Sequence, residues 1–151
     1  MVTGATSGLG WRFAQVLAAA GAKVIGTGRR RERLDELVAA IECNGGSAIG
    51  VEMDMTDTES IFAGVDEAEA AFGTITILVN NAGIPDAQRA HKMSIELIDR
   101  VFDTNLRGPF VLSCEIARRL IDKQLPGRQV NISSIGATNY GATEFTRANG
   151  Q

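Results

Sequence analysis

Histidine, cysteine and long apolar runs are scarce in this chain of 151 residues, and each scarcity excludes a class of function. His91 is the only histidine, so a histidine-based catalytic triad or a zinc site has almost no support. The two cysteines lie in no metal-ligand spacing, and we expect Cys114 to be a small buried hydrophobe on the apolar face of a helix. No apolar run approaches the roughly 20 residues of a membrane span, so we predict no membrane partner.

An excess of positive charge is also missing. The chain has 15 basic and 18 acidic residues, a net charge of −3 and no basic run, which argues against a nucleic-acid partner. No signal peptide is visible, because Met1 leads directly into an expected strand and a glycine turn, and this favours the cytoplasm. Hydrophobic residues make up 44% of the chain, which is enough for the core of one globular domain spanning residues 1–151.

Short apolar runs rich in β-branched residues alternate with helical patterns along the chain. Strands are expected at residues 1–3, 23–26, 48–53, 75–80 and 129–132, and helices at residues 9–20, 34–41, 61–72, 94–101 and 110–123. Thr56 with Glu59 has the spacing of a capping box ahead of the third helix, and Ser94 can cap the fourth. This alternation predicts an α/β fold of the doubly wound, Rossmann type, with a parallel sheet in a three-layer αβα arrangement.

The most informative motif is the glycine-rich turn TGATSGLG at residues 3–10, between an expected strand and an expected helix. Its spacing is TGxxxGxG and not GxGxxG, but the same physics applies. Glycines let the backbone turn tightly and approach a pyrophosphate, and the following helix offers free N–H groups and the positive end of its dipole. Thr6 and Ser7 can add hydroxyl donors. The turn therefore predicts a dinucleotide site.

The end of the second strand favours NADP(H) over NAD(H). NAD-binding folds usually place a carboxylate there for the ribose 2′-hydroxyl, but this chain has Gly28 followed by Arg29. Glycine leaves room for a 2′-phosphate, and arginine can pair with it through two hydrogen bonds. The alternative is that Arg29 and its basic neighbours are the solvated start of a helix, although positive charge there opposes the helix dipole.

Five motifs in order resemble the short-chain dehydrogenase/reductase family over nearly the whole chain: residues 3–10, Asp54, residues 80–83 (NNAG), Asn105 and residues 131–134 (NISS). The resemblance implies that Asp54 contacts the adenine, that Asn105 supports a proton-relay water and that Ser134 is the catalytic serine. The candidate nucleotide-binding residues are Gly4, Thr6, Ser7, Gly8, Leu9, Gly10, Arg29, Asp54, Met55, Asn80, Ala82 and Gly83.

The chain departs from the family at the catalytic tyrosine. Members of the family use a Tyr-x-x-x-Lys pair on the next helix, in which the lysine holds the nicotinamide ribose and lowers the pKa of the tyrosine. Tyr140 is the only tyrosine here, it follows Ser134 by only six residues, and Glu144 stands where the lysine is expected. A glutamate would raise the tyrosine pKa and repel the cofactor phosphates. Since the family continues beyond this point, we expect a shortened member, incomplete on the C-terminal side.

Three functions are compatible with these features. The first is an NADP(H)-dependent oxidoreductase that moves hydride between the cofactor and a small carbonyl or alcohol substrate, with Asn105, Ser134 and Tyr140 as catalytic residues. The second is an inactive nucleotide-binding fragment, and the third is a regulatory partner of an intact relative. The family associates through the helix that begins near Asn105, so the resemblance also implies a homo-oligomer, either a dimer or a tetramer.

Overall fold

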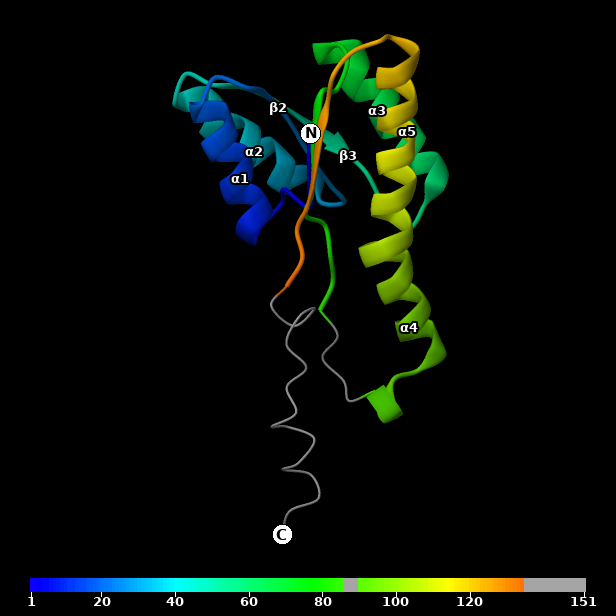
Figure 1. Cartoon of the computed structure of the whole chain (residues 1–151). Coiled ribbons are helices and arrows are strands. Elements are labelled where there is room, and N and C mark those ends of the chain that lie inside the picture. Colours follow the sequence, from blue (N-terminus) through cyan, green and yellow to red (C-terminus); the bar gives the residue numbers. More distant parts are fainter. Residues whose placement is uncertain (86–89, 135–151) are drawn as a thin grey trace.

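A computed structural model describes residues 1–85 and 90–134, and within them a parallel five-stranded sheet lies between two layers of helices (Figure 1). The strands are β1 (Val2–Thr3), β2 (Lys23–Gly28), β3 (Ser47–Glu52), β4 (Ile77–Asn80) and β5 (Arg128–Asn131). The helices are α1 (Gly8–Ala19), α2 (Arg31–Cys43), α3 (Thr58–Phe72), α4 (Ile95–Phe102) and α5 (Gly108–Asp122), with a short 3₁₀ turn η1 (Ala90–Lys92) and a π-helical turn η2 (Asp103–Arg107).

The strand order is β3-β2-β1-β4-β5, and every pair is parallel. In the register, Val2 of β1 lies opposite Gly26 of β2 on one side and Val79 of β4 on the other. The chain therefore reverses its winding direction at β1, which is the topological switch point of a doubly wound sheet. Figure 1 shows α1 and α2 on one face of the sheet and α3 and α5 on the other. The predicted Rossmann-type αβα fold is confirmed.

The core has two parts, one on each face of the sheet. On the face covered by α3 and α5, the buried side chains include Val51, Ile61, Leu78, Leu112 and Ile116. On the face covered by α1 and α2, they include Val2, Ala14, Val24, Leu37 and Ile41. Strands buried on both faces need continuous apolar runs, which explains why the central strands contain so few polar residues.

Helix starts agree with the sequence prediction in one case and contradict it in another. Ser94 caps α4, because its hydroxyl accepts a hydrogen bond from Leu97 N at 3.2 Å. The predicted capping box of Thr56 and Glu59 is wrong. The helix α3 is capped by Asp57, whose carboxylate accepts from Glu59 N at 3.0 Å. Thr56 instead donates both its N–H and its hydroxyl to the carboxylate of Asp54, so its side chain is directed to Asp54 and not to the N–H groups at the start of the helix.

The prediction that Cys114 is buried is also wrong. Cys114 is exposed, and Phe110, one helical turn earlier on α5, is 68% exposed. The helix α5 has two apolar stripes, and the sheet takes the one formed by Leu112, Ile116 and Leu120, which recur every four residues. Cys114 and Phe110 therefore face away from the sheet.

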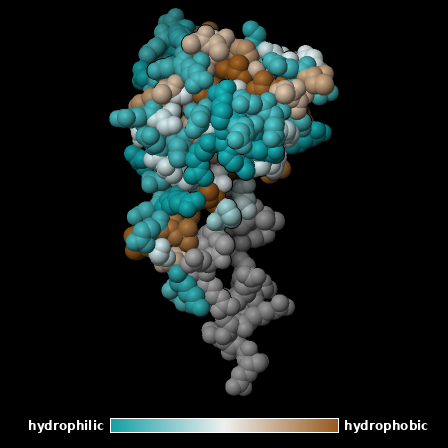
Figure 2. Space-filling model, turned by 180° about the vertical axis from the view of Figure 1, so that it is seen from behind, coloured by the Kyte–Doolittle hydropathy of each residue, from teal (hydrophilic) through white to brown (hydrophobic). Residues whose placement is uncertain are grey.

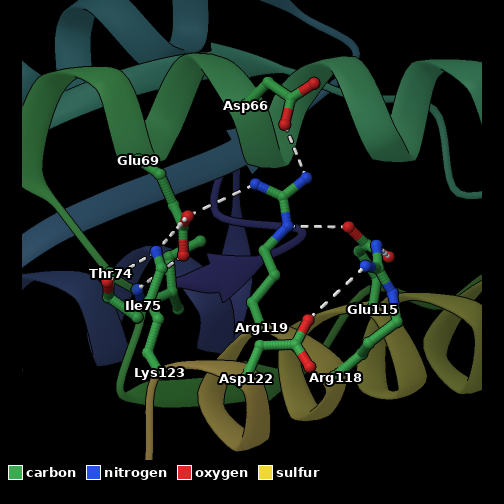
Figure 3. Close-up of polar contacts among 9 residues, drawn as sticks. All are labelled: Asp66, Glu69, Thr74, Ile75, Glu115, Arg118, Arg119, Asp122 and Lys123. Atoms are coloured by element: carbon green, nitrogen blue, oxygen red, sulfur yellow. Dashed lines mark hydrogen bonds and ion pairs between the residues drawn. The ribbon is translucent and has the colours of Figure 1, made fainter. Parts of the chain in front are cut away.

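An ion-pair network joins α3 to α5 on the outer side of the sheet (Figure 3). The guanidinium of Arg119 contacts three carboxylates, with Asp66 at 2.5 Å, Glu115 at 2.7 Å and Glu69 at 3.3 Å. The ammonium of Lys123 lies 3.1 Å from Glu69. Only 6% of the Glu115 side chain and 13% of the Glu69 side chain is exposed, so these charges depend on their partners.

Burial alone would raise the pKa of the Glu69 carboxyl, but hydrogen bonds from Lys123, from Ile75 N and from Arg119 outweigh it and hold that pKa below its usual value. The pKa of Glu115 is lowered in the same way, because hydrogen bonds from Arg118 and Arg119 outweigh its burial. The network therefore favours two ionised carboxylates between the helices.

The strand β5 forms one edge of the sheet, and all four of its residues are exposed. Within residues 1–85 and 90–134, it pairs with β4 alone. This agrees with the expected incomplete sheet. No helix in these same ranges is both long enough and apolar enough to cross a lipid bilayer.

Candidate nucleotide-binding cleft

A cleft of about 310 Å³ opens at the carboxyl ends of the central strands, beside the switch point at β1. This is where doubly wound sheets bind their ligands, since the loops on either side of the switch point diverge. The cleft is lined by Gly4, Thr6, Ser7, Thr27, Gly28, Arg29, Arg30, Met53, Asp54, Met55, Asn81, Ala82, Gly83, Ile84 and Thr104. Eight of the twelve predicted nucleotide-binding residues are among them, and they come from turns after β1, β2, β3 and β4.

The glycine turn packs tightly against the loop that follows β4. A Cβ atom on Gly10 would lie 2.4 Å from the carbonyl oxygen of Gly4 and 2.5 Å from the side-chain nitrogen of Asn81. A Cβ atom on Gly4, where φ is +67°, would lie 2.8 Å from Ala82 Cα. Gly8 has φ +55° but open space around it, so it is needed for its backbone conformation only. These glycines let two loops meet at backbone distance on the floor of the cleft.

Hydrogen bonds between Thr3 and Asn81 hold the same two loops together. The Thr3 hydroxyl accepts from Asn81 N at 3.0 Å and from Ala82 N at 2.9 Å. The Asn81 side chain donates to the carbonyl of Thr3 at 3.0 Å. Because Thr3 is buried, these bonds replace water for three backbone groups that the close packing would otherwise leave unsatisfied. These hydrogen bonds fix the spacing between the glycine turn and residues 82–84, which line the opposite wall of the cleft.

Two arginines stand at the rim of the cleft after β2. Arg29 forms an ion pair with Asp54 at 4.0 Å. Arg30 donates to the hydroxyl of Thr6 at 2.8 Å and to that of Ser7 at 3.1 Å. Asp54 in turn is oriented by Thr56, whose N–H and hydroxyl both donate to its Oδ1 at 2.9 Å. The rim therefore combines two cations, two hydroxyls and one carboxylate of fixed orientation.

Asn105 lies in η2, the π-helical turn between α4 and α5, which is a type of insertion often found at functional sites. Its side-chain oxygen accepts from Ile84 N at 2.8 Å, and its side-chain nitrogen donates to Ile84 O at 2.9 Å. Both polar ends of the side chain thus hold the loop that lines the cleft.

Four predicted nucleotide contacts do not line the cleft: Gly8, Leu9, Gly10 and Asn80. Asn80 lies behind it and donates to Ser113 Oγ and to Asn131 Oδ1, each at 2.9 Å, so it joins β4, β5 and α5. Ser134 is exposed and follows β5 by three residues. Tyr140 and Glu144 lie outside the described residues.

The candidate list omits seven of the fifteen residues that line the cleft: Thr27, Gly28, Arg30, Met53, Asn81, Ile84 and Thr104. Arg30 follows Arg29 directly, but periodicity does not show that both of these adjacent side chains line the cleft. Ile84 and Thr104 lie at the cleft because the side chain of Asn105, next to Thr104, forms two hydrogen bonds with the backbone of Ile84. No local sequence pattern predicts this long-range contact. Nowhere in the described ranges do three or more His, Cys, Asp or Glu residues gather in a group that could hold a metal ion.

This topology and cleft define a Rossmann-type α/β protein whose cleft lies where such folds bind dinucleotides. The family description "short chain dehydrogenase" matches residues 1–146, and the chain belongs to that family. Similar curated proteins include an uncharacterised oxidoreductase YxbG of Bacillus subtilis, which is 33% identical, with 98% of this chain and 58% of that protein covered. The 3-oxoacyl-(acyl-carrier-protein) reductase FabG of Escherichia coli is 35% identical, with 95% of this chain and 60% of that protein covered.

Solved structures show the same likeness. A metagenomic short-chain oxidoreductase in complex with NADP has a TM-score of 0.86 at 33% identity, with 93% of this chain and 64% of that chain covered. An actinorhodin polyketide ketoreductase with NADPH has a TM-score of 0.87 at 31% identity, with 99% and 62% covered. The chain spans between 51% and 61% of the length of eight curated relatives that it matches.

Proposed function

We propose that this protein binds NADP(H) in the cleft and exchanges hydride with a small carbonyl or alcohol substrate. The proposal rests on the close packing of the glycine turn against the loop after β4, which brings Gly4, Ala82 and Gly83 together at the switch point. Arg29 and Arg30 lie at the rim of the same cleft. Backbone N–H groups without intervening side chains suit a pyrophosphate, and arginines suit an additional phosphate. Relatives named as dehydrogenases and reductases, and two neighbours solved with NADP or NADPH, support the same conclusion.

In the proposed reaction, the residues of this chain bind, orient and move protons. NADP(H), when bound, supplies or accepts the hydride. The hydroxyl of Ser134 would hydrogen-bond the reacting oxygen of the substrate, and Tyr140 would exchange the proton with that oxygen. Asn105 would act as a positioning residue, because its side chain holds the Ile84 loop at the wall of the cleft.

A titration followed by an activity assay tests the proposal. NADPH and NADH are titrated into the purified protein, and turnover is then measured on a panel of carbonyl substrates. We expect NADPH to bind more tightly than NADH, and the substitution Ser134→Ala to lower kcat by about 100-fold or more without changing NADPH affinity, because the serine contacts the substrate oxygen and not the nucleotide. If neither nucleotide binds, the proposal is wrong at its first step.

The alternative function is nucleotide binding without turnover, and the glutamate at position 144 favours it. A carboxylate in place of the lysine would raise the pKa of the tyrosine and remove the ribose contact. The substitution Glu144→Lys then becomes the decisive variant, because it restores the family's Tyr-x-x-x-Lys spacing. Turnover that appears only in this variant would establish the chain as a nucleotide-binding protein that has lost its catalytic step.

We also propose that two copies associate through an apolar ridge on α4, η2 and α5. The ridge consists of the exposed side chains Ile95, Phe102, Leu106 and Phe110, which are between 58% and 68% exposed. Phe102, Leu106 and Phe110 recur every four residues and so lie on one side of the helical segment. Figure 2 shows hydrophobic surface gathered over the region of α4 in the lower part of the molecule. Large contiguous apolar surface of this kind usually marks an interface.

Charge placed on this ridge should therefore produce a monomer. We expect Phe110→Glu to shift the protein from dimer or tetramer to monomer in light-scattering chromatography, because two buried carboxylates would face each other across the symmetric contact. Leu9→Glu is the matched control, since Leu9 is 63% exposed but lies on α1, away from the ridge. An unchanged mass for Phe110→Glu, or a monomeric starting protein, would contradict the proposed interface.

A further inference from the structure

We propose that the open edge of the strand β3 docks an extended, basic segment of another protein, which adds to the sheet as a further strand. This inference goes beyond the proposed function and does not depend on it, because it concerns the edge of the sheet and not the nucleotide cleft. The edge combines free backbone groups, a groove that leaves them accessible and acidic walls on both sides.

The backbone of β3 offers hydrogen-bonding groups on its outer side. Among the residues that the structure describes, β3 pairs with β2 alone, in an unbroken parallel register over all six residues of the strand. Met53 N, directly after the strand, donates to Gly28 O at 3.0 Å, so alternate residues direct their N–H and C=O groups to β2. The N–H and C=O groups of Ala48, Gly50 and Glu52 therefore point away from the sheet. A regular edge of this kind is a template for another strand.

One side chain covers part of this edge. Arg31, at the start of α2, donates to Gly50 O at 3.3 Å, which agrees with an outward direction of this carbonyl. Arg31 also pairs with Asp35 at 3.0 Å, and more than half of each of these two side chains is exposed. Arg31 can therefore move aside without leaving a buried charge behind, and an incoming N–H group can replace it on Gly50 O.

A groove of about 470 Å³ lies on the outer side of β3, between α2 on one face of the sheet and α3 on the other (Figure 1). Small residues line it on all sides, with Ala39 on α2, Ala71 on α3, and Ala48 and Gly50 on the strand. Side chains of this size leave room for a backbone at the spacing of about 4.8 Å that separates neighbouring strands. The groove therefore fits an extended chain beside β3.

The walls of the groove are acidic. Glu42 on α2 and Glu67 on α3 both line it, and neither forms an ion pair with any residue in the described ranges. Asp35 supplies a third carboxylate, and Arg31 is the one basic residue among the described residues of the lining. Successive side chains of an added strand point to opposite faces of the sheet. Two adjacent basic residues would thus reach Glu42 on one wall and Glu67 on the other.

The same charges argue against a second copy of this chain as the occupant. Pairing of β3 with β3 of another molecule would bring Glu42 and Glu67 toward their counterparts, and like charges at close range repel. Charged side chains beside an edge strand protect a protein from such self-association. The occupant is therefore a segment of opposite charge, held by main-chain hydrogen bonds and selected by its side chains.

The test uses the whole protein and the blocked peptide TVTKRVTV, which favours an extended conformation and carries two adjacent cations. Binding is followed by NMR through the shifts and the hydrogen exchange of backbone amides. We expect saturable binding below about 1 mM. Exchange should slow at Ala48, Gly50 and Glu52 but not at Ile49 and Val51, whose amides already face β2. This alternation is the signature of an added strand.

Charge reversal tests the contribution of the walls. We expect Glu67→Lys to weaken binding of the peptide by about tenfold, because one ion pair is replaced by a repulsion. Glu59→Lys is the matched control, since Glu59 is exposed on the same helix but does not line the groove, and it should change the affinity by no more than about twofold. The acidic peptide TVTEEVTV should not bind measurably. Melting temperatures confirm that each variant is folded.

Each contrary result has a distinct meaning. If the basic peptide does not bind below about 1 mM, or binds without slowing exchange at the alternate amides, the inference is overturned. Equal binding to the wild-type protein and to Glu67→Lys, or equal binding of both peptides, also overturns it, because charge then has no part in recognition. Slow exchange of the same amides that depends on protein concentration alone would show that a second copy occupies the edge, which overturns the basic partner.

Discussion

Replacing Gly10 with alanine should abolish dinucleotide binding, even though Gly10 does not line the cleft. The added methyl carbon would lie 2.4 Å from Gly4 O and 2.5 Å from the Asn81 side chain, and both neighbours are fixed by backbone contacts. The turn and the loop after β4 must then separate. We expect NADPH affinity to fall by at least about 100-fold, because losing one or two hydrogen bonds to a charged phosphate, at about 1.5 to 3 kcal/mol each, costs that much. Calorimetric titration measures it.

Gly8→Ala is the matched comparison, in the same turn and two residues earlier. Gly8 has φ +55°, but a methyl group there meets nothing within 4 Å. Alanine at this position should therefore cost only the backbone strain of about 1 to 2 kcal/mol in folding stability, and should retain measurable NADPH binding. Equal losses in the two variants would show that conformation alone, and not close packing on Asn81, makes the glycines of this turn necessary.

The fold could be predicted well from the sequence because its signals are local. Each buried strand is a short apolar run, and each helix has an apolar stripe at helical spacing, so the alternation determined the parallel sheet. The errors arose where two local solutions compete. Asp57, and not Thr56, caps α3, because Thr56 is hydrogen-bonded to Asp54. The helix α5 has two apolar stripes, and only contact with the sheet decides which one is buried.

The site was predicted less completely, because its geometry depends on contacts between distant residues. The sequence identified the glycine turn and Asp54, but it could not show that Asn80 would turn toward Asn131, 51 positions away. Nor could it show that Asp54, 25 positions from Arg29, would form an ion pair with it at the rim of the cleft. In both cases the residue type was a correct guide to the region, and the direction of the side chain was set by tertiary packing.

The ion-pair network between α3 and α5 is a further long-range feature, and it leads to a second large effect. We expect Arg119→Met to lower the free energy of unfolding by about 3 kcal/mol at pH 7, because the nearly buried carboxylates of Glu69 and Glu115 lose a shared cation. Methionine keeps much of the apolar contact of the arginine stem. Arg118→Met is the matched control. Arg118 also contacts Glu115, but its side chain is 63% exposed, so about 1 kcal/mol or less is expected.

The pH dependence of the Arg119→Met effect distinguishes lost ion pairing from lost packing. In the wild-type protein the pKa values of Glu69 and Glu115 are lowered on folding, so their contribution to stability is present above about pH 4.5 and is lost as the pH falls through the lowered values. Without Arg119 we expect those pKa values to rise, since each carboxylate keeps only one cationic partner, Lys123 for Glu69 and Arg118 for Glu115, and mild acid then neutralises them more readily. Urea unfolding of both proteins between pH 7 and pH 4 should therefore show a difference that shrinks with acidity. A difference that stays constant over this range would mean that Arg119 stabilises the protein through packing alone.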